Sequence, residues 1–290
     1  MMKGNNYVFR SQLFVIFLLV MSIIFILTGC KNVKLPVYLN PGPNPVPTYK
    51  FDYRPSENLQ KVKEPYAFLL LGTRNDFQQP YSKGELKIAI GKILLPRLST
   101  ESANDMNQII NNFRYALKED FKELLTARGF RLIGEGENQD IITFNQREIS
   151  NFSMQPVIRI ELDDTVDSTT SPDQPKFFAD WEPGEIKGKL IVKARISLEV
   201  KEPLTWQMLW TKSVESQAYS EDYSFKWNYA QNPLGYVVGQ DTRPQVLANI
   251  MNKLYLDVMN KFETYIDPNE FSLINKQAQE IRKKAQQVIK

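Results

Sequence analysis

The chain has 290 residues, of which 42% are apolar and 24% charged, a composition typical of a folded globular protein rather than a disordered one. It contains no histidine and a single cysteine, Cys30. Without histidine, Ser-His-Asp and Cys-His nucleophilic sites, HExxH zinc sites and Cys/His zinc ribbons are excluded. No pair of carboxylates has a spacing that favours a glycosidase. We therefore expect a protein that is not an enzyme, with no catalytic residue, no metal site and no cofactor.

The first thirty residues predict a signal peptide. Lys3 and Arg10 form a basic n-region, and an almost uninterrupted apolar stretch covers residues 13–27. This stretch is short for a bilayer span of about 20 residues but suits the h-region of a signal peptide. It ends in Leu-Thr-Gly-Cys at Cys30, which resembles the bacterial lipobox, where the cysteine thiol receives diacylglycerol and the signal peptidase cuts before it. An uncleaved anchor helix and a secretory signal with a chance cysteine are the alternatives.

Lipidation at Cys30 divides the chain into three parts. Residues 1–29 are the signal peptide that is removed, residues 30–50 are the lipidated cysteine and a Pro-rich tether, and residues 51–290 form a single domain. The prolines forbid a helix and favour an extended tether of about 60 Å at ~3.1 Å per residue. A proline-rich arm packed on the domain is the alternative.

The anchor also indicates the compartment and the partners. Lys31 rather than aspartate follows Cys30, which by resemblance to lipoprotein sorting in enteric bacteria indicates the outer membrane. Two or three acyl chains at Cys30 would hold the protein firmly to that membrane. Cleavage leaves 34 basic and 33 acidic side chains, a net charge of +1. With no global positive field, we expect no nucleic-acid partner.

Local patterns predict the elements of residues 51–150. Strands are expected at residues 66–71, which read as buried on both faces, and at residues 86–95, 130–133 and 141–144. A helical apolar stripe from about residue 99 predicts a long helix with Gly129 as its C-cap.

The later residues predict further strands followed by helices. Residues 158–162 and 186–200 alternate as a hairpin would, and residues 204–219 are expected to form the next strand, with Trp206, Met208 and Trp210 on one face. Thr242 to Gln245 resembles a capping box that begins a helix ending at Asp267-Pro268. A last helix carries a coiled-coil-like seam from Phe271 to Val288, which packs on its own domain or on one partner helix.

These elements predict an α+β fold. The sheet is expected to be largely antiparallel, with a mixed sheet as the alternative, and long helices are expected to pack on one of its faces. A C-terminal helical segment completes the domain.

Two groups of residues are candidates for ligand binding. Lys187, Lys189, Lys193 and Arg195 share one face of a predicted strand and could hold an anionic ligand such as a sialic acid carboxylate; a solvated sheet face is the alternative. Trp227 and Tyr229 belong to an aromatic-rich stretch that could stack on sugar rings or pack in the core. The acidic residues between Asp163 and Asp173 lack EF-hand spacing and read as a polar hairpin loop.

The order of several short motifs resembles the bacterial neuraminyllactose-binding haemagglutinin family, surface lipoproteins also described as flagellar-sheath adhesins. The motifs are the lipobox at Cys30, Asp52-Tyr53-Arg54-Pro55-Ser56-Glu57, Ala116-Leu117-Lys118, Gly129-Phe130-Arg131-Leu132-Ile133, the strand ending Ile196 to Pro203, and Ala248-Asn249-Ile250-Met251-Asn252-Lys253-Leu254. The family's proposed sialic-acid motif is a basic tract before the central strand. Here that place is the acidic loop Asp163 to Asp173, with only Lys176 basic, so no motif residue is carried across.

The resemblance implies a non-enzymatic lipoprotein of the outer membrane or cell surface, an adhesin or flagellar-sheath component with sialylated host glycans as its ligands. The alternative is a periplasm-facing lipoprotein that docks on an envelope or flagellar protein. That docking would use the C-terminal helix seam or the aromatic stretch.

Overall fold

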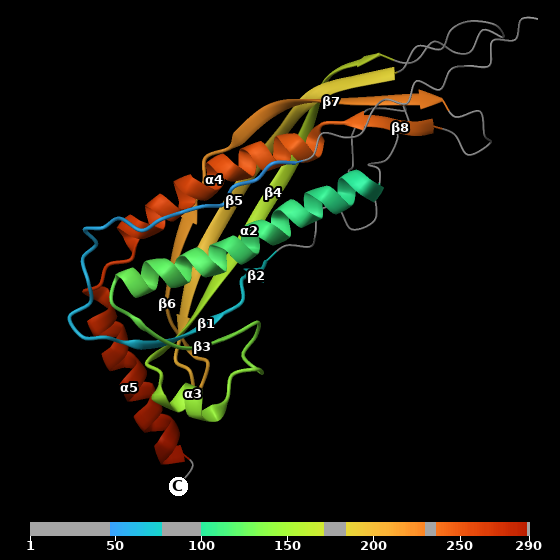
Figure 1. The fold of residues 1–290 in the computed structure, drawn as a ribbon. Coiled ribbons are helices and arrows are strands. Elements are labelled where there is room, and N and C mark those ends of the chain that lie inside the picture. Colours follow the sequence, from blue (N-terminus) through green and yellow to red (C-terminus); the bar gives the residue numbers. More distant parts are fainter. Residues whose placement is uncertain (1–46, 77–99, 171–183, 230–235, 289–290) are drawn as a thin grey trace, which may run out of the picture. The chain divides into compact units, whose positions relative to one another are not determined.

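The strands form one eight-stranded sheet in the computed structural model, which describes residues 47–76, 100–170, 184–229 and 236–288. Its order is β3-β1-β4-β5-β7-β8, with β2 paired to β4 and β6 paired to β5 (Figure 1). The strands are β1 (Ala67–Leu71), β2 (Arg74–Asn75), β3 (Arg131–Gly136), β4 (Phe152–Thr170), β5 (Gly184–Lys201), β6 (Met208–Glu215), β7 (Tyr219–Tyr229) and β8 (Tyr236–Asp241). The helices are α2 (Thr100–Ala127), α3 (Phe144–Ile149), α4 (Arg243–Tyr265) and α5 (Glu270–Val288).

The sheet is mixed, which corrects the expectation of a largely antiparallel one. β1 runs parallel to both β3 and β4, and β2 runs parallel to β4. The antiparallel part consists of the β4–β5 hairpin and the strands β6, β7 and β8 beside it. Parallel neighbours need a crossover, and here the long helix α2 separates β1 and β2 from β3 along the chain.

β1 is buried on both faces, as its continuous apolar run predicts. Phe68 and Leu70 belong to the main hydrophobic core, whereas Leu69 and Leu71 pack with Ile142 in a second, smaller cluster. Because successive strand residues point to opposite faces, the second cluster lies on the other side of the sheet. The segment leading into α3 therefore covers the face opposite α2 and α4, and the helical segments do not all lie on one face.

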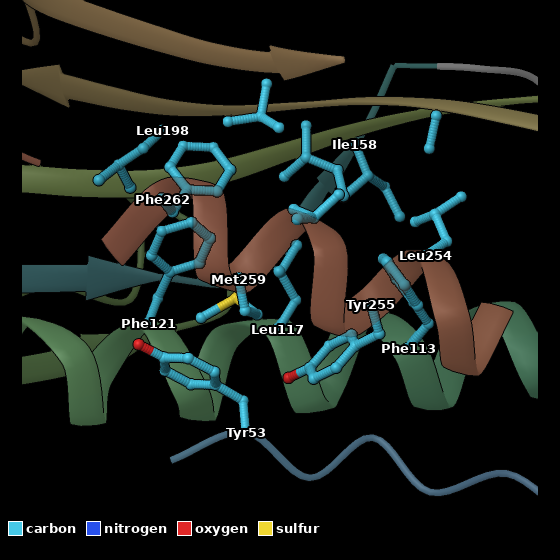
Figure 2. Close-up of a cluster of buried hydrophobic side chains, with 14 of the residues drawn as sticks. Tyr53, Phe113, Leu117, Phe121, Ile158, Leu198, Leu254, Tyr255, Met259 and Phe262 are labelled. Atoms are coloured by element: carbon cyan, nitrogen blue, oxygen red, sulfur yellow. The ribbon is translucent and has the colours of Figure 1, made fainter. Parts of the chain in front are cut away.

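The main core lies between the sheet and the parallel helices α2 and α4 (Figure 2). Phe113 of α2 contacts Tyr255 of α4 edge-on at 5.3 Å, and Phe121 contacts Phe262 at 4.8 Å. Ring pairs in such T-shaped contacts are favoured beyond the area they bury. The helical stripe read from the sequence is confirmed in α2, which ends before Gly129 at φ +89°.

A segment ahead of β1, residues 48–62, packs along α2 and α4 and is called the strap here. Thr48 donates its backbone N–H to Oε1 of Gln245 at 3.3 Å, and Lys50 donates to Oδ1 of Asn252 at 2.8 Å. The packed part of the chain therefore includes residues ahead of the expected boundary at residue 51. Figure 1 shows the strap in blue alongside α4.

Four local predictions are wrong. The strand predicted at residues 204–219 covers only Met208–Glu215, so Trp206 lies in the loop before it. Asp163 and Asp164, predicted to lie in a hairpin loop, are part of β4. Residues 141–144 do not form a strand; Thr143 instead caps α3, accepting a hydrogen bond from the backbone N–H of Gln146, whose side chain returns to the cap in a capping box. Thr242 makes no cap for α4, because its hydroxyl is bonded to the backbone N–H and carbonyl of Ser224 on β7. The strand predicted at residues 86–95 lies outside the described residues.

Candidate functional site

The exposed face of the antiparallel sheet carries the basic stripe read from the sequence. Lys187, Lys189, Lys193 and Arg195 are all exposed on β5. The alternating residues of β5, among them Leu190 and Val192, are buried in the main core. The strand period of two thus separates a solvated charged face from the core face within one element.

Carboxylates are interleaved with these cations. Nζ of Lys187 lies 3.3 Å from Oε2 of Glu185, and Nε of Arg195 lies 3.7 Å from Oε1 of Glu215. In the strand register, Lys193 pairs with Glu161 of β4 and Lys189 pairs with Asp222 of β7. The surface therefore has mixed charge, and its ion pairs are exposed, so each one stabilises the fold by less than about 1 kcal/mol.

At one position on this face, two cations lie directly opposite each other on neighbouring strands. Arg195 pairs in register with Arg159 of β4, and Arg159 lies 3.3 Å from Glu161. Like charges directly opposite on a sheet are unfavourable, and an anion bridging them relieves the repulsion. Together with Lys193, these two guanidinium groups form the part of the face best suited to a carboxylate ligand.

The aromatic stretch has two parts: the first is buried in the core, and the side chains of the second lie outside the described residues. Tyr223 and Phe225 of β7 are buried, and the guanidinium of Arg243 lies 4.7 Å from the ring centre of Phe225. The Tyr223 hydroxyl donates to Asp164 at 2.6 Å; burial and this bond raise the pKa of Tyr223, and burial raises the pKa of Asp164. Trp227 and Tyr229 end β7, but their side chains lie outside the described part.

A buried ion pair at the start of α4 lies against this aromatic stretch. Arg243 donates to both oxygens of Asp241, at 2.8 and 2.7 Å, and both side chains are at most 1% exposed. A bidentate pair of this kind positions the start of α4 against β7 and β8. Both charges are used inside the protein, so this cluster holds the fold together rather than forming a ligand site.

Neither the acidic segment nor the groove beside the strap forms a stronger candidate. Asp163 and Asp164 lie within β4, and the described residues include no acidic cluster that could hold a metal ion. A groove of about 570 Å³ lies between the strap and α2. Its Lys122 is bonded to Glu135 at 2.9 Å and Glu119 at 3.0 Å, which raises the pKa of Lys122 and engages its charge.

The surface around α3 was missed in the sequence. Ile141, Phe144 and Ile149 are each 60% exposed within nine residues, and next to them Arg147 lies 5.8 Å from the ring centre of Trp206. Trp206 has φ +59°, a left-handed conformation that costs about 1–3 kcal/mol in a bulky residue. The prediction of a strand at residues 141–144 did not point to this surface, because a strand would bury every second one of these side chains.

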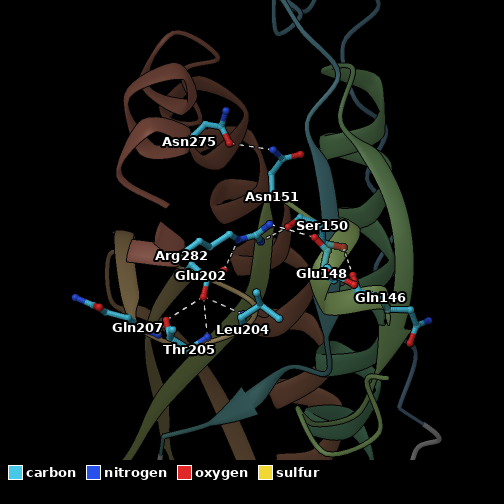
Figure 3. A network of polar contacts seen from close by, with 10 residues as sticks. All are labelled: Gln146, Glu148, Ser150, Asn151, Glu202, Leu204, Thr205, Gln207, Asn275 and Arg282. Carbon is cyan, nitrogen blue, oxygen red and sulfur yellow. Dashed lines mark hydrogen bonds and ion pairs between the residues drawn. The ribbon is translucent and has the colours of Figure 1, made fainter. Parts of the chain in front are cut away.

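Buried Glu202 holds the loop that carries Trp206 (Figure 3). Its Oε2 accepts hydrogen bonds from the backbone N–H groups of Leu204 and Thr205, at 2.9 and 2.7 Å. Its Oε1 accepts from Nε of Arg282 at 2.6 Å, and Arg282 also donates to the carbonyls of Glu148 and Ser150. Glu202 and Arg282 together thus connect the β5–β6 loop, α3 and α5.

No protein-family model matches this sequence, and no curated protein matches it. Among solved structures, the chain is similar to a homolog of neuraminyllactose-binding hemagglutinin from Helicobacter pylori, at 12% identity and a TM-score of 0.49, covering 78% of this chain and 98% of that one. It is also similar to a DUF330 protein from Xanthomonas campestris, at 9% identity and a TM-score of 0.31, covering 81% and 96%. No TM-score here reaches 0.5, so membership of the haemagglutinin family stays a prediction.

None of the described helices is both long and apolar enough to cross a bilayer. The apolar stretch at residues 13–27 and the lipobox at Cys30 lie outside the described residues. Their assignment rests on the sequence.

Proposed function

We propose that this chain is a lipoprotein of the outer membrane, anchored through Cys30, whose domain acts without catalysis as a surface adhesin or sheath component. The observation that carries the proposal is the lipobox at the end of a correctly built signal peptide. The short Pro-rich stretch after Cys30 then leads directly into the strap, so the anchor and the folded domain are joined by fewer than twenty residues.

A sialylated glycan is the ligand class that the exposed sheet face favours. A sialic acid contributes a carboxylate, and Arg159, Lys193 and Arg195 gather three cations at one place on that face. The interleaved acids would limit this to a weak, millimolar contact typical of single lectin sites, worth about 4 kcal/mol. Lys187 and Lys189 would extend the site along β5. In the β5–β7 register Trp227 pairs with Gly184, which belongs to the opposite face of the sheet from Lys187, so Trp227 and Tyr229 are not part of this site.

Anchoring and exposure are tested together on cells. Metabolic labelling with palmitate should mark the wild-type protein and not the Cys30→Ser variant. A protease added to unbroken cells should digest the domain. Absence of label at Cys30 would overturn the anchor, and protection of the domain until the outer membrane is opened would overturn the outward orientation.

Glycan binding is tested by titrating the protein with sialyl-lactose, with lactose as the control sugar. Binding of sialyl-lactose alone, lost in the double variant Lys193→Ala/Arg195→Ala, is the expected result. Lys253→Ala is the matched control, because it removes an exposed cation from α4 and leaves the sheet face unchanged. No heat and no chemical-shift change at millimolar sugar would refute glycan binding.

A second candidate function is docking on an envelope protein through the α3 surface. Ile141, Phe144 and Ile149 expose large apolar side chains, and Arg147 and Trp206 add residue types enriched in protein interfaces. The protease experiment separates the two candidates, because a periplasm-facing domain is protected on unbroken cells.

A further inference from the structure

The strap follows α4 for almost the whole length of the helix with no slack. Thr48 is bonded to Gln245 near the start of α4, and Ser56 is bonded to Glu263 near its end. These two helix residues are about 27 Å apart at ~1.5 Å per residue. The eight residue-to-residue steps from Thr48 to Ser56 cover that distance only if the strap is almost fully extended, at ~3.4 Å per step. It is therefore taut against the helix.

Polar contacts hold the strap at both of its ends. At the first end, Lys50 donates to Asn252, whose side-chain amide donates back to the carbonyl of Thr48 at 3.2 Å. At the other end, the hydroxyls of Tyr53 and Ser56 both donate to the carboxylate of Glu263. These hydrogen bonds lower the pKa of Glu263, so this carboxylate is ionised at neutral pH and its bonds are charge-assisted.

The middle and the far end of the strap are buried against α2 as well. The ring of Phe51 lies 5.4 Å from that of Phe113 on α2 and 5.2 Å from that of Tyr255 on α4. Tyr53 is 4% exposed and points into the space between the two helices (Figure 2). Past these rings, Arg128 at the end of α2 donates to the carbonyls of Gln60 and Glu263. The strap is thus held by both helices of the core.

We propose that the strap is a shear clamp that transmits tension from the lipid anchor to the α2–α4 pair. The chain leaves the strap toward Cys30 at the α4 start, whereas α5 and the C-terminus follow from the α4 end. A pull applied at residue 47 and at the end of α4 therefore loads the strap along its own axis. When a force acts parallel to a row of contacts, all of them bear it and they break together. When the force lifts the row from one end, the contacts break one after another. The proposal rests on the lipid-anchored function above, which gives the strap a load to carry.

The test is a single-molecule stretching experiment on the mature chain, residues 30–290, made without lipid. Cys30 is the only cysteine, so its thiol takes one handle and the C-terminus takes the other. The wild-type strap should hold until the core opens. In Glu263→Ala, the strap should leave first at a lower force, as a separate step of about 25 Å. This is the contour length of about 50 Å for residues 48–62, at ~3.4 Å per residue, less the ~27 Å that the strap already spans along α4. Tyr53→Phe should show the same step at an intermediate force.

Lys261→Ala is the matched control, because its partner Asp257 lies on α4 and neither residue contacts the strap in the described hydrogen bonds. It should behave as the wild type does. The same separate step in the wild type, at the same force as in Glu263→Ala, would overturn the clamp. So would a Glu263→Ala variant whose core opens at a lower force without any separate step. Because the handle replaces the lipid, these outcomes are independent of the palmitate result.

Discussion

Asp120 is the buried carboxyl group that ties α2 to both α4 and the strap. It is 9% exposed and accepts hydrogen bonds from the Tyr255 hydroxyl and the backbone N–H of Tyr53. Burial is the main reason that its pKa is raised from 3.8 to about 6; the nearby carboxylates Glu123 and Asp52 also raise the pKa, and the two hydrogen bonds lower it. A raised pKa means that the folded state binds this proton more tightly than the unfolded state does.

Asp120 should make the protein more stable in mild acid than at neutral pH. Its contribution is fully present below about pH 3.8 and is lost as the pH rises through about 6. At ~1.4 kcal/mol per pH unit, the whole contribution is about 3 kcal/mol. In Asp120→Asn, urea unfolding at pH 7.5 should show a higher stability than the wild type, and the fall in stability between pH 4 and 6 should flatten.

Asp257→Asn is the matched control for that measurement, because Asp257 pairs on the surface of α4 with Lys261, and none of the described hydrogen bonds or ion pairs joins it to the strap or to α2. It should keep the wild-type pH profile. An Asp120→Asn profile with the wild-type slope between pH 4 and 6 would show that Asp120 is not the group responsible.

At the scale of elements, Arg282 attaches α5 to the rest of the fold. Its Nε donates to Glu202, which is 0% exposed, and its terminal nitrogens donate to two carbonyls at the end of α3. The apolar seam of α5 is buried at Phe271, Ile274 and Ala278. That part of the predicted seam packs on its own domain.

Arg282→Ala should lower the free energy of unfolding by about 3–5 kcal/mol, because it leaves the Glu202 carboxylate buried without its cation. The comparison is Lys253→Ala, which breaks an ion pair whose lysine side chain is 61% exposed and should cost less than about 1 kcal/mol. Urea unfolding measures both variants. Equal losses in the two would contradict the role assigned to Arg282.

For the whole molecule, the strap decides where the folded part of the chain must begin. A variant that starts at residue 47 retains every described contact of the strap, and its urea unfolding should match that of the mature chain. A variant that starts at residue 63 lacks Phe51 and Tyr53, two aromatic side chains worth about 1.5–3 kcal/mol each when buried. It should lose at least about 3 kcal/mol. Equal stability of the two variants would show that the strap adds nothing to the fold.

Local periodicity was enough to predict the elements with regular patterns. The alternation of β5, the helical stripes of α2 and α4, and the two-sided burial of β1 could all be read directly, because each depends on neighbours within a few residues. The same alternation placed Lys187, Lys189, Lys193 and Arg195 together on one face. Cys30 was predicted to be the lipidated residue from the lipobox, a short contiguous motif, and this stays a prediction.

The remaining features depend on contacts between residues far apart in the chain. The parallel pairing of β1 with β3, the bond from Tyr53 to Glu263 and the bond from Arg282 to Glu202 join residues that share no local pattern. Thr143 and Thr242 show why this matters: both begin a capping-box sequence, and only Thr143 forms the box, because Ser224 takes the hydroxyl of Thr242. Short motifs specify what a residue can bond to, and the tertiary structure decides which partner comes within reach.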